Sequence, residues 1–169
     1  MAEEPLCWFV LRMSHGRELR VRDRLTALGV ENFIPTQKTR GATGRTVEKP
    51  LVNCLGFVRA TKKDALDLIH FRGVQADYML DHATHKLMVV PDREMDDFRR
   101  VFDLSLDEVT TERPLALGAP VQVIKGPLTG VHGRVVGEAG KWYVVVELLG
   151  MLYASARVPK SWLQLAETE

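Results

Sequence analysis

The most constraining feature of this chain is a run of valines interrupted by glycines between residues 121 and 136. Its pattern is Val-x-Val-x-x-Gly-Pro-x-x-Gly-x-x-Gly-x-Val-Val. Valines two positions apart lie on the same face of a strand. Gly126-Pro127 favours a tight turn, because glycine is free in φ whereas proline is fixed. The pattern therefore predicts two strands joined by a turn in which the chain doubles back.

The rest of the C-terminal region has the same composition. Short apolar runs are separated by glycines, and residues 142–146 are Trp-Tyr-Val-Val-Val, which has high β propensity. Each glycine would weaken a helix by roughly 0.5–1 kcal/mol relative to alanine, and Pro127 and Pro159 would break one. We predict a small β-barrel of about five strands over residues 118–169 rather than a helical hairpin.

Residues 1–103 alternate between strand-like and helix-like patterns. Aromatic and apolar runs at 7–13, 32–35 and 51–60 predict strands, and 78–80 with 87–90 predicts a hairpin. Ser14 is a candidate N-cap for a first helix ending at Gly29, and Thr61 for a second helix. Pro91 precedes a third, with Met95, Phe98 and Phe102 on one face. The expected fold is α+β: an antiparallel sheet of about four strands with three helices, then a linker at 104–117.

Positive charge is concentrated near the N-terminus although the formal net charge is only +1. Residues 12–49 hold nine lysines and arginines against four acids, whereas the region from Leu104 holds six against seven. A polyanion would therefore meet the first domain. Two basic groups stand out, one at helical spacing and one in a glycine-containing loop or ribbon at 36–49. They are Arg17, Arg20 and Arg24, and Lys38, Arg40 and Arg45. Ordinary solvation of a charged surface is the alternative.

Other features exclude several classes of protein. No apolar run approaches the roughly 20 residues that span a bilayer, and the acidic start lacks the apolar segment of a signal peptide. Cys7 and Cys54 form neither a disulfide framework nor a zinc site, and His82-x-x-His85 has no cysteine nearby. No catalytic triad or phosphate-binding glycine loop is present. We expect a cytoplasmic, monomeric protein that is not an enzyme and holds no metal or cofactor.

The glycine-proline turn resembles the KOW motif of NusG-type transcription factors and several ribosomal proteins. The matching residues are Gly126, Pro127, Gly130 and Gly133. Residues 8–11 and 33–36 are similar to the first two strands of the family's NGN domain, and Arg72-Gly73-Val74 to the segment after its second helix. Within the NusG family the chain most resembles the specialised paralogues RfaH and, especially, the UpxY antiterminators of polysaccharide operons.

This resemblance implies a factor that binds the RNA polymerase clamp during elongation and suppresses pausing or termination. An apolar depression would make the contact, through Trp8, Phe9, Val52, Leu55 and Phe57. The family's Phe-Pro-Gly-Tyr-Val-Phe-Val is Val-Asn-Cys-Leu-Gly-Phe-Val here, at residues 52–58, so part of the aromatic rim is replaced. Strand alternation would place Val52 and Cys54 on one face and Leu55 and Phe57 on the other. Either face could meet polymerase, the alternative being that these side chains are sheet core.

The resemblance also suggests further partners. The two basic groups would contact non-template or upstream DNA, or nascent RNA. The KOW unit would bind a ribosomal protein of the NusE type, Rho or neither. Two other functions stay open: a general housekeeping NusG, and a KOW-bearing RNA- or ribosome-binding protein. The second would favour a basic β module, and this one is nearly neutral.

Overall fold

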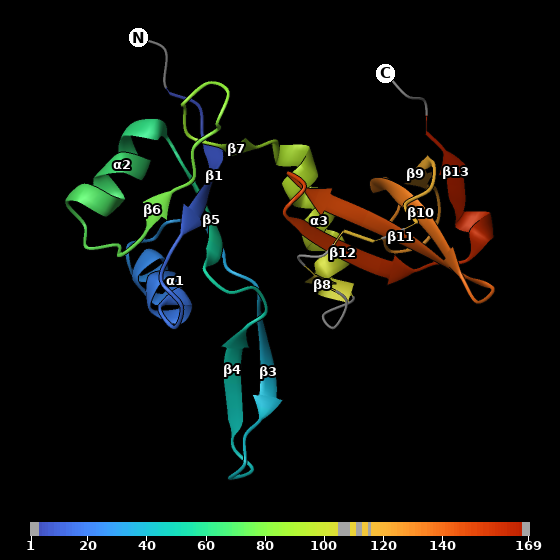
Figure 1. The fold of residues 1–169 in the computed structure, drawn as a ribbon, viewed down its shortest axis with the longest axis horizontal. Coiled ribbons are helices and arrows are strands. Elements are labelled where there is room, and N and C mark those ends of the chain that lie inside the picture. Colours follow the sequence, from blue (N-terminus) through green and yellow to red (C-terminus); the bar gives the residue numbers. More distant parts are fainter. Residues whose placement is uncertain (1–3, 105–108, 111–112, 115, 167–169) are drawn as a thin grey trace. The chain divides into compact units, whose positions relative to one another are not determined.

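The structure, a computed structural model, describes residues 4–104, 109–110, 113–114 and 116–166 (Figure 1). It divides into two compact units, Met1–Asp92 and Arg93–Glu169. Helix α3 (Asp92–Leu104) thereby groups with the second unit. The domain bounds expected from the sequence, 1–103 and 118–169 with a linker at 104–117, stay a prediction.

The first unit contains an antiparallel sheet in the order β2-β5-β1-β6, with β7 also paired to β1. Its strands are β1 (Cys7–Arg12), β2 (Asn32–Phe33), β5 (Leu55–Ala60), β6 (Asp77–Tyr78) and β7 (Val89–Val90). The apolar run of β1 lies in the interior, between β5 on one side and both short strands on the other. The expected hairpin at 78–90 is thus reduced to one bridge between Leu80 and Leu87, because β6 and β7 each pair with β1.

Helices α1 (Glu18–Ala27) and α2 (Lys62–His70) pack against one face of this sheet. Their apolar residues share a core with the facing strand residues, including Phe9, Leu11, Val21, Leu25, Val58, Ala60, Ala65 and Leu68. The Thr61 hydroxyl caps α2 as predicted, accepting a hydrogen bond from the Asp64 amide at 3.1 Å. Gly29, at φ +73°, ends α1 in a Schellman turn, in which the Val30 amide donates to the Leu25 carbonyl.

Strand β5 begins later than the sequence indicates. Residues 51–54 form a turn, and Cys54 has φ +67°. The expected alternation of Val52 and Cys54 along a strand is therefore wrong, because neither residue lies in β5. The turn is fixed by backbone contacts on both sides of Cys54: its carbonyl accepts from Met13, and its amide donates to Glu18.

Residues 36–50 form a separate two-stranded ribbon of β3 (Thr36–Arg40) and β4 (Thr46–Pro50). This confirms the ribbon alternative for the basic stretch. The tip turns through Gly44, which has φ +77°. The ribbon projects away from the sheet and helices of its own unit (Figure 1).

The second unit combines α3 with a six-stranded antiparallel sheet, in the order β13-β9-β10-β11-β12-β8. The strands are β8 (Val109–Thr110), β9 (Pro120–Val123), β10 (His132–Glu138), β11 (Lys141–Leu148), β12 (Leu152–Arg157) and β13 (Leu163–Leu165). Residues 142–146 lie within β11, so the predicted strand is confirmed and this described segment is not part of a helical hairpin. Strand β8 falls inside the expected linker, whose residues 105–108, 111–112 and 115 lie outside the described residues.

The glycines of the β9–β10 turn are required by space as well as by conformation. Gly126 has φ +84°, and a Cβ there would lie 2.4 Å from the Trp162 ring. A Cβ on Gly133 would lie 2.5 Å from the Val145 carbonyl oxygen of the neighbouring strand. The doubled-back turn predicted from the sequence is closed by the Gly130 amide, which donates to the Val123 carbonyl at 2.7 Å.

Candidate functional site

The sheet of the first unit has a second apolar face, opposite α1 and α2. In the β1–β5 register Val10 lies opposite Phe57, and Arg12 lies opposite Leu55. Strand alternation adds Trp8 to this side. The Phe33 ring of β2 stacks on Phe57, with centroids 6.2 Å apart. We call these residues, namely Trp8, Val10, Phe33, Leu55 and Phe57, the aromatic face.

The structure separates the five residues expected to contact polymerase. Trp8, Leu55 and Phe57 belong to the aromatic face, whereas Phe9 packs in the core beneath the helices, edge-on to Tyr78. Val52 lies in the turn before β5. Trp8 is 2% exposed and Phe57 is fully buried, whereas Leu55 is half-buried. The aromatic face is therefore a packed surface, with Leu55 its most accessible predicted contact.

The three arginines predicted on α1 form a second surface, the basic face. Arg17, Arg20 and Arg24 are all exposed. Arg17 Nη1 donates to the Gln75 side-chain oxygen at 2.8 Å, and Arg24 Nε donates to the Arg72 carbonyl at 2.9 Å. These two bonds attach the basic face to the turn that follows α2.

Two grooves border the basic face. The smaller, of about 90 Å³, is lined by Arg17, Arg20, Val21, Arg24, Gly73 and Gln75. The larger, of about 570 Å³, shares Arg17 and Gln75 with the smaller one and also includes Arg12, Ser14 and Cys54. Both grooves are walled by guanidinium groups, with Asp77 as the acid in the larger one. Such a surface suits an anion, because arginine offers several donors in a fixed plane.

The two acids that interleave with these arginines in sequence differ, because Asp23 is exposed and pairs with Arg22, whereas Glu18 is buried. Glu18 is 1% exposed, and its carboxylate turns inward. Both of its oxygens accept from the Gly16 amide at 3.1 Å, and Oε1 also accepts from the Cys54 amide at 3.3 Å. The sequence suggested Ser14 as the N-cap of α1, but the structure places the N-cap at Arg17. Arg17 occupies that position without a side-chain cap.

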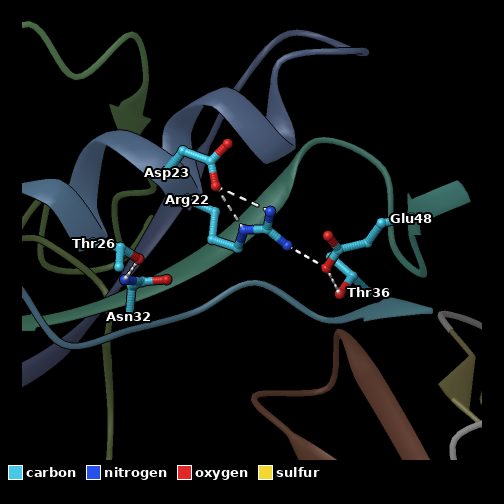
Figure 2. A network of polar contacts seen from close by, with 6 residues as sticks. All are labelled: Arg22, Asp23, Thr26, Asn32, Thr36 and Glu48. Carbon is cyan, nitrogen blue, oxygen red and sulfur yellow. Dashed lines mark hydrogen bonds and ion pairs between the residues drawn. The ribbon is translucent and has the colours of Figure 1, made fainter. Parts of the chain in front are cut away.

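A polar network fixes the base of the ribbon to α1 (Figure 2). Arg22 donates to Asp23 on its own helix and to Glu48 on β4, and the Thr36 hydroxyl of β3 donates to the same Glu48 carboxylate at 2.7 Å. These hydrogen bonds lower the pKa of Glu48, and the bond to Glu48 raises the pKa of Arg22. Lys38, Arg40 and Arg45 are exposed further along the ribbon.

Three residues of this surface were missed by the sequence analysis. Arg12 ends β1 and lines the larger groove, while Phe71 and Arg72 follow α2 and are exposed. Arg72 and Phe71 carried no periodic signal, because they lie in a turn. The contact between Arg72 and Arg24 joins residues 48 positions apart, which only the folded chain brings together.

The β9–β10 turn contacts α3 within the second unit. Arg100 Nη2 donates to the Pro127 carbonyl at 3.0 Å, and the Asp97 carboxylate accepts from the His132 amide at 3.2 Å. One turn earlier, Glu94 accepts from the Leu149 amide at 2.6 Å. Burial raises the pKa of both carboxyl groups, and the backbone hydrogen bonds offset part of this effect.

Neither a metal site nor a membrane span is found in the described part of the chain. No cluster of three or more histidine, cysteine or acidic residues there could hold a metal ion. His82 and His85 lie in a polar turn around Asp81, whose side chain accepts from the Ala83 amide. None of the helices described is long and apolar enough to cross a bilayer.

Comparison with known protein families identifies the class to which this α+β protein belongs. The family model described as "NusG: Transcription termination factor nusG" matches residues 6–99, more than half of the chain. The chain belongs to the NusG family, whose members are transcription factors and not enzymes. No curated protein matches the chain.

Several solved structures are also similar to the chain. A structure on domain interaction in Thermotoga maritima NusG is 21% identical, with a TM-score of 0.48, and covers 96% of this chain and 98% of its own. Two conformations of the MjSpt4:Spt5 complex follow. Conformation A is 14% identical with a TM-score of 0.31, covering 96% of this chain and 99% of its own. Conformation B is 15% identical with a TM-score of 0.29, covering 95% and 97%.

Proposed function

We propose that this protein binds RNA polymerase during elongation through its first unit and suppresses pausing or termination. The observation that carries the proposal is the NusG family match over residues 6–99, which spans the whole sheet of that unit and so includes the aromatic face. No bond is made or broken by the factor. It acts by binding one state of the polymerase more tightly than another, which shifts the population toward that state.

The aromatic face is the proposed contact with the polymerase clamp. Leu55 lies at its accessible edge, and Val52 adjoins it in the preceding turn. Trp8 and Phe57 are buried, so the side chains covering them must move aside before they can contact a partner. Phe9 contributes indirectly, by holding β1 against the helices.

Charge substitution at the edge of the aromatic face tests this contact. Leu55→Asp is expected to abolish capture of RNA polymerase by the full chain, because an anchor in such an interface typically contributes about 2 kcal/mol or more. Leu165→Asp is the matched control, since Leu165 is 73% exposed and lies in the second unit. Circular dichroism establishes that each variant is folded. Retained capture by folded variants at Leu55, Val52 and Phe57 would overturn the proposal.

The basic face and the ribbon form the proposed contact with nucleic acid. Their exposed groups are Arg17, Arg20, Arg24, Lys38, Arg40 and Arg45. Contacts to phosphates release counterions, so the logarithm of the binding constant should fall linearly with the logarithm of the salt concentration. Replacing the three ribbon residues by glutamine should reduce that slope in binding to an elongation complex. An unchanged slope would leave the ribbon charges as solvated surface.

The protein is proposed to act on particular operons, as the resemblance to RfaH and UpxY antiterminators suggests. A general NusG is the second candidate, favoured by the family description as a termination factor. Transcription with purified components decides between them. An operon-specific factor stimulates read-through only on templates carrying its own leader, whereas a general factor acts equally on unrelated templates. The second unit is proposed to bind a NusE-type ribosomal protein or Rho, which a pull-down with each purified protein tests.

A further inference from the structure

The ribbon is joined to the rest of the first unit through two adjacent chain connections. Among the described strands β3 and β4 pair only with each other, so no neighbouring strand limits their tilt. The chain enters the ribbon after Pro35 and leaves it at Pro50, and the Leu51 amide donates to the Pro35 carbonyl at 2.9 Å. Two adjacent connections define an axis but not an angle about it. A third contact, away from that axis, is needed to fix the angle of the ribbon.

Arg22 and Glu48 make this third contact (Figure 2). Arg22 Nη1, on α1, donates to Glu48 Oε1 on β4. Within the described part of the first unit, no other hydrogen bond or ion pair joins a side chain of residues 36–50 to a different element. The two side chains are 27% and 29% exposed, so water and salt screen the pair less than they would a fully exposed one.

Each partner of this pair is also oriented by a residue of its own element. Asp23 Oδ1 accepts from Arg22 Nε at 3.1 Å and from Nη2 at 3.0 Å, which fixes the plane of the guanidinium group. The Thr36 hydroxyl, on β3, donates to Glu48 Oε1 at 2.7 Å. Because both side chains are already held, their pairing loses less rotamer entropy than the pairing of two free surface side chains.

The charges around this pair make it decisive for the angle of the ribbon. Helix α1 carries three arginines, and Glu18, one of its two acids, is buried. Glu48 is the only acid among residues 36–50, which also hold four basic residues: Lys38, Arg40, Arg45 and Lys49. Loss of the Glu48 carboxylate would therefore leave two positively charged elements next to each other, and like charges repel.

We propose that Arg22 and Glu48 are positioning residues, which form a clamp that holds the ribbon at the angle required for binding to an elongation complex. The inference rests on the proposed function and adds to it how the ribbon is positioned. The tip of the ribbon lies about five residues beyond its base, or about 17 Å, so a tilt of about 20° would move the tip by about 6 Å. Such a shift exceeds the reach of a hydrogen bond. An unclamped ribbon would bind only in the fraction of molecules that have the right angle, and the apparent affinity would fall by that fraction.

Two variants break the clamp from opposite sides and change the net charge in opposite directions. Arg22→Ala removes a positive charge, whereas Glu48→Ala removes a negative one. Binding of the full chain to an RNA polymerase elongation complex is measured for each variant and for the double variant. Lys62→Ala and Asp64→Ala are the matched controls, because they make the same two charge changes at exposed positions of α2, away from the ribbon (Figure 1).

Both clamp variants are expected to weaken binding about tenfold, which corresponds to the correct angle in about a tenth of the molecules. The double variant should bind no more weakly than either single one, because all three lack the same contact. The sign for Glu48→Ala is the sharpest test, since loss of an acid from a basic surface would by charge alone strengthen binding to nucleic acid. The two controls should stay within about twofold of the unmodified chain.

A second measurement reports on the angle itself, without polymerase. Residual dipolar couplings of the ¹⁵N-labelled full chain give the orientation of the ribbon amides relative to those of β1 and β5. In the unmodified chain both sets should fit one orientation. In the clamp variants the ribbon couplings should be reduced by averaging over several angles, although the backbone pairing of β3 with β4 persists.

Several results would overturn the inference, and they can be told apart. Ribbon couplings that still fit the orientation of the sheet in both variants would show that the clamp does not set the angle. Opposite changes in affinity for Arg22→Ala and Glu48→Ala would reduce their effect to net charge, and additive losses in the double variant would make them independent contacts. Failure of the unmodified chain to bind the elongation complex would overturn the proposed function, and with it the role of the clamp in binding.

Discussion

The buried carboxylate of Glu18 should be the most sensitive polar position of the first unit. It accepts from two backbone amides, those of Gly16 and Cys54, which belong to segments 38 residues apart that it ties together. Replacing it with alanine leaves both donors without this acceptor. A hydrogen bond to a charged acceptor contributes about 1.5–3 kcal/mol, so we expect the loss of both in Glu18→Ala to lower the free energy of unfolding by about 3 kcal/mol.

Hydrogen exchange of the β1 and β5 amides is the appropriate assay, because it reports on the first unit alone. A loss of about 3 kcal/mol would raise the opening equilibrium of those amides by roughly two orders of magnitude. Glu18→Gln keeps one acceptor oxygen and should lose about half as much. Asp23→Ala, which removes an exposed carboxylate on the same helix, should change stability by about 0.5 kcal/mol or less. If Glu18→Ala behaved like Asp23→Ala, the inward carboxylate would not hold these segments together.

Two further predictions concern the second unit. Gly126→Ala combines φ +84° with a Cβ placed 2.4 Å from the Trp162 ring, so it should destabilise this unit by about 2 kcal/mol or more, and an unchanged melting temperature would contradict the steric argument. The raised pKa of Asp97 means that the folded unit holds its proton more tightly than the unfolded chain. The stabilisation is complete below the ordinary carboxyl value of about 4 and is lost as pH rises through the raised one. In urea titrations at several pH values, Asp97→Asn should therefore gain stability relative to the unmodified protein as pH rises, and a constant difference would refute this.

Local chemistry made much of the fold predictable. Gly29 ends α1 and Thr61 caps α2, because each acts on groups within a few residues. The valine and glycine spacing similarly predicted β9 and β10, and the β propensity of residues 142–146 predicted β11. Pairing across long separations was not predictable in this way. Strands β6 and β7 pair with β1 some 70 to 80 positions away rather than with each other.

The candidate site shows the same division. Helical spacing correctly predicted that Arg17, Arg20 and Arg24 form one exposed face. It could not predict that Glu18, which lies between them in sequence, is buried and accepts a hydrogen bond from the Cys54 amide. The sequence also did not show whether Phe9 or Trp8 lies beneath the helices. Both faces of β1 are apolar, and strand alternation alone does not say which face meets the helices.

The way in which the ribbon is attached bears on how this protein could diversify. Strands β3 and β4 pair with each other and with no further strand among those described. Their base is held by Arg22, Glu48 and Thr36, and by the Leu51 amide donating to the Pro35 carbonyl at 2.9 Å. Insertion of two residues into each strand beyond this base would lengthen the ribbon and keep every side chain on its original face, because side chains alternate with a period of two. During evolution, the length of the ribbon and the residues at its tip could thus change while the sheet of the first unit stays the same.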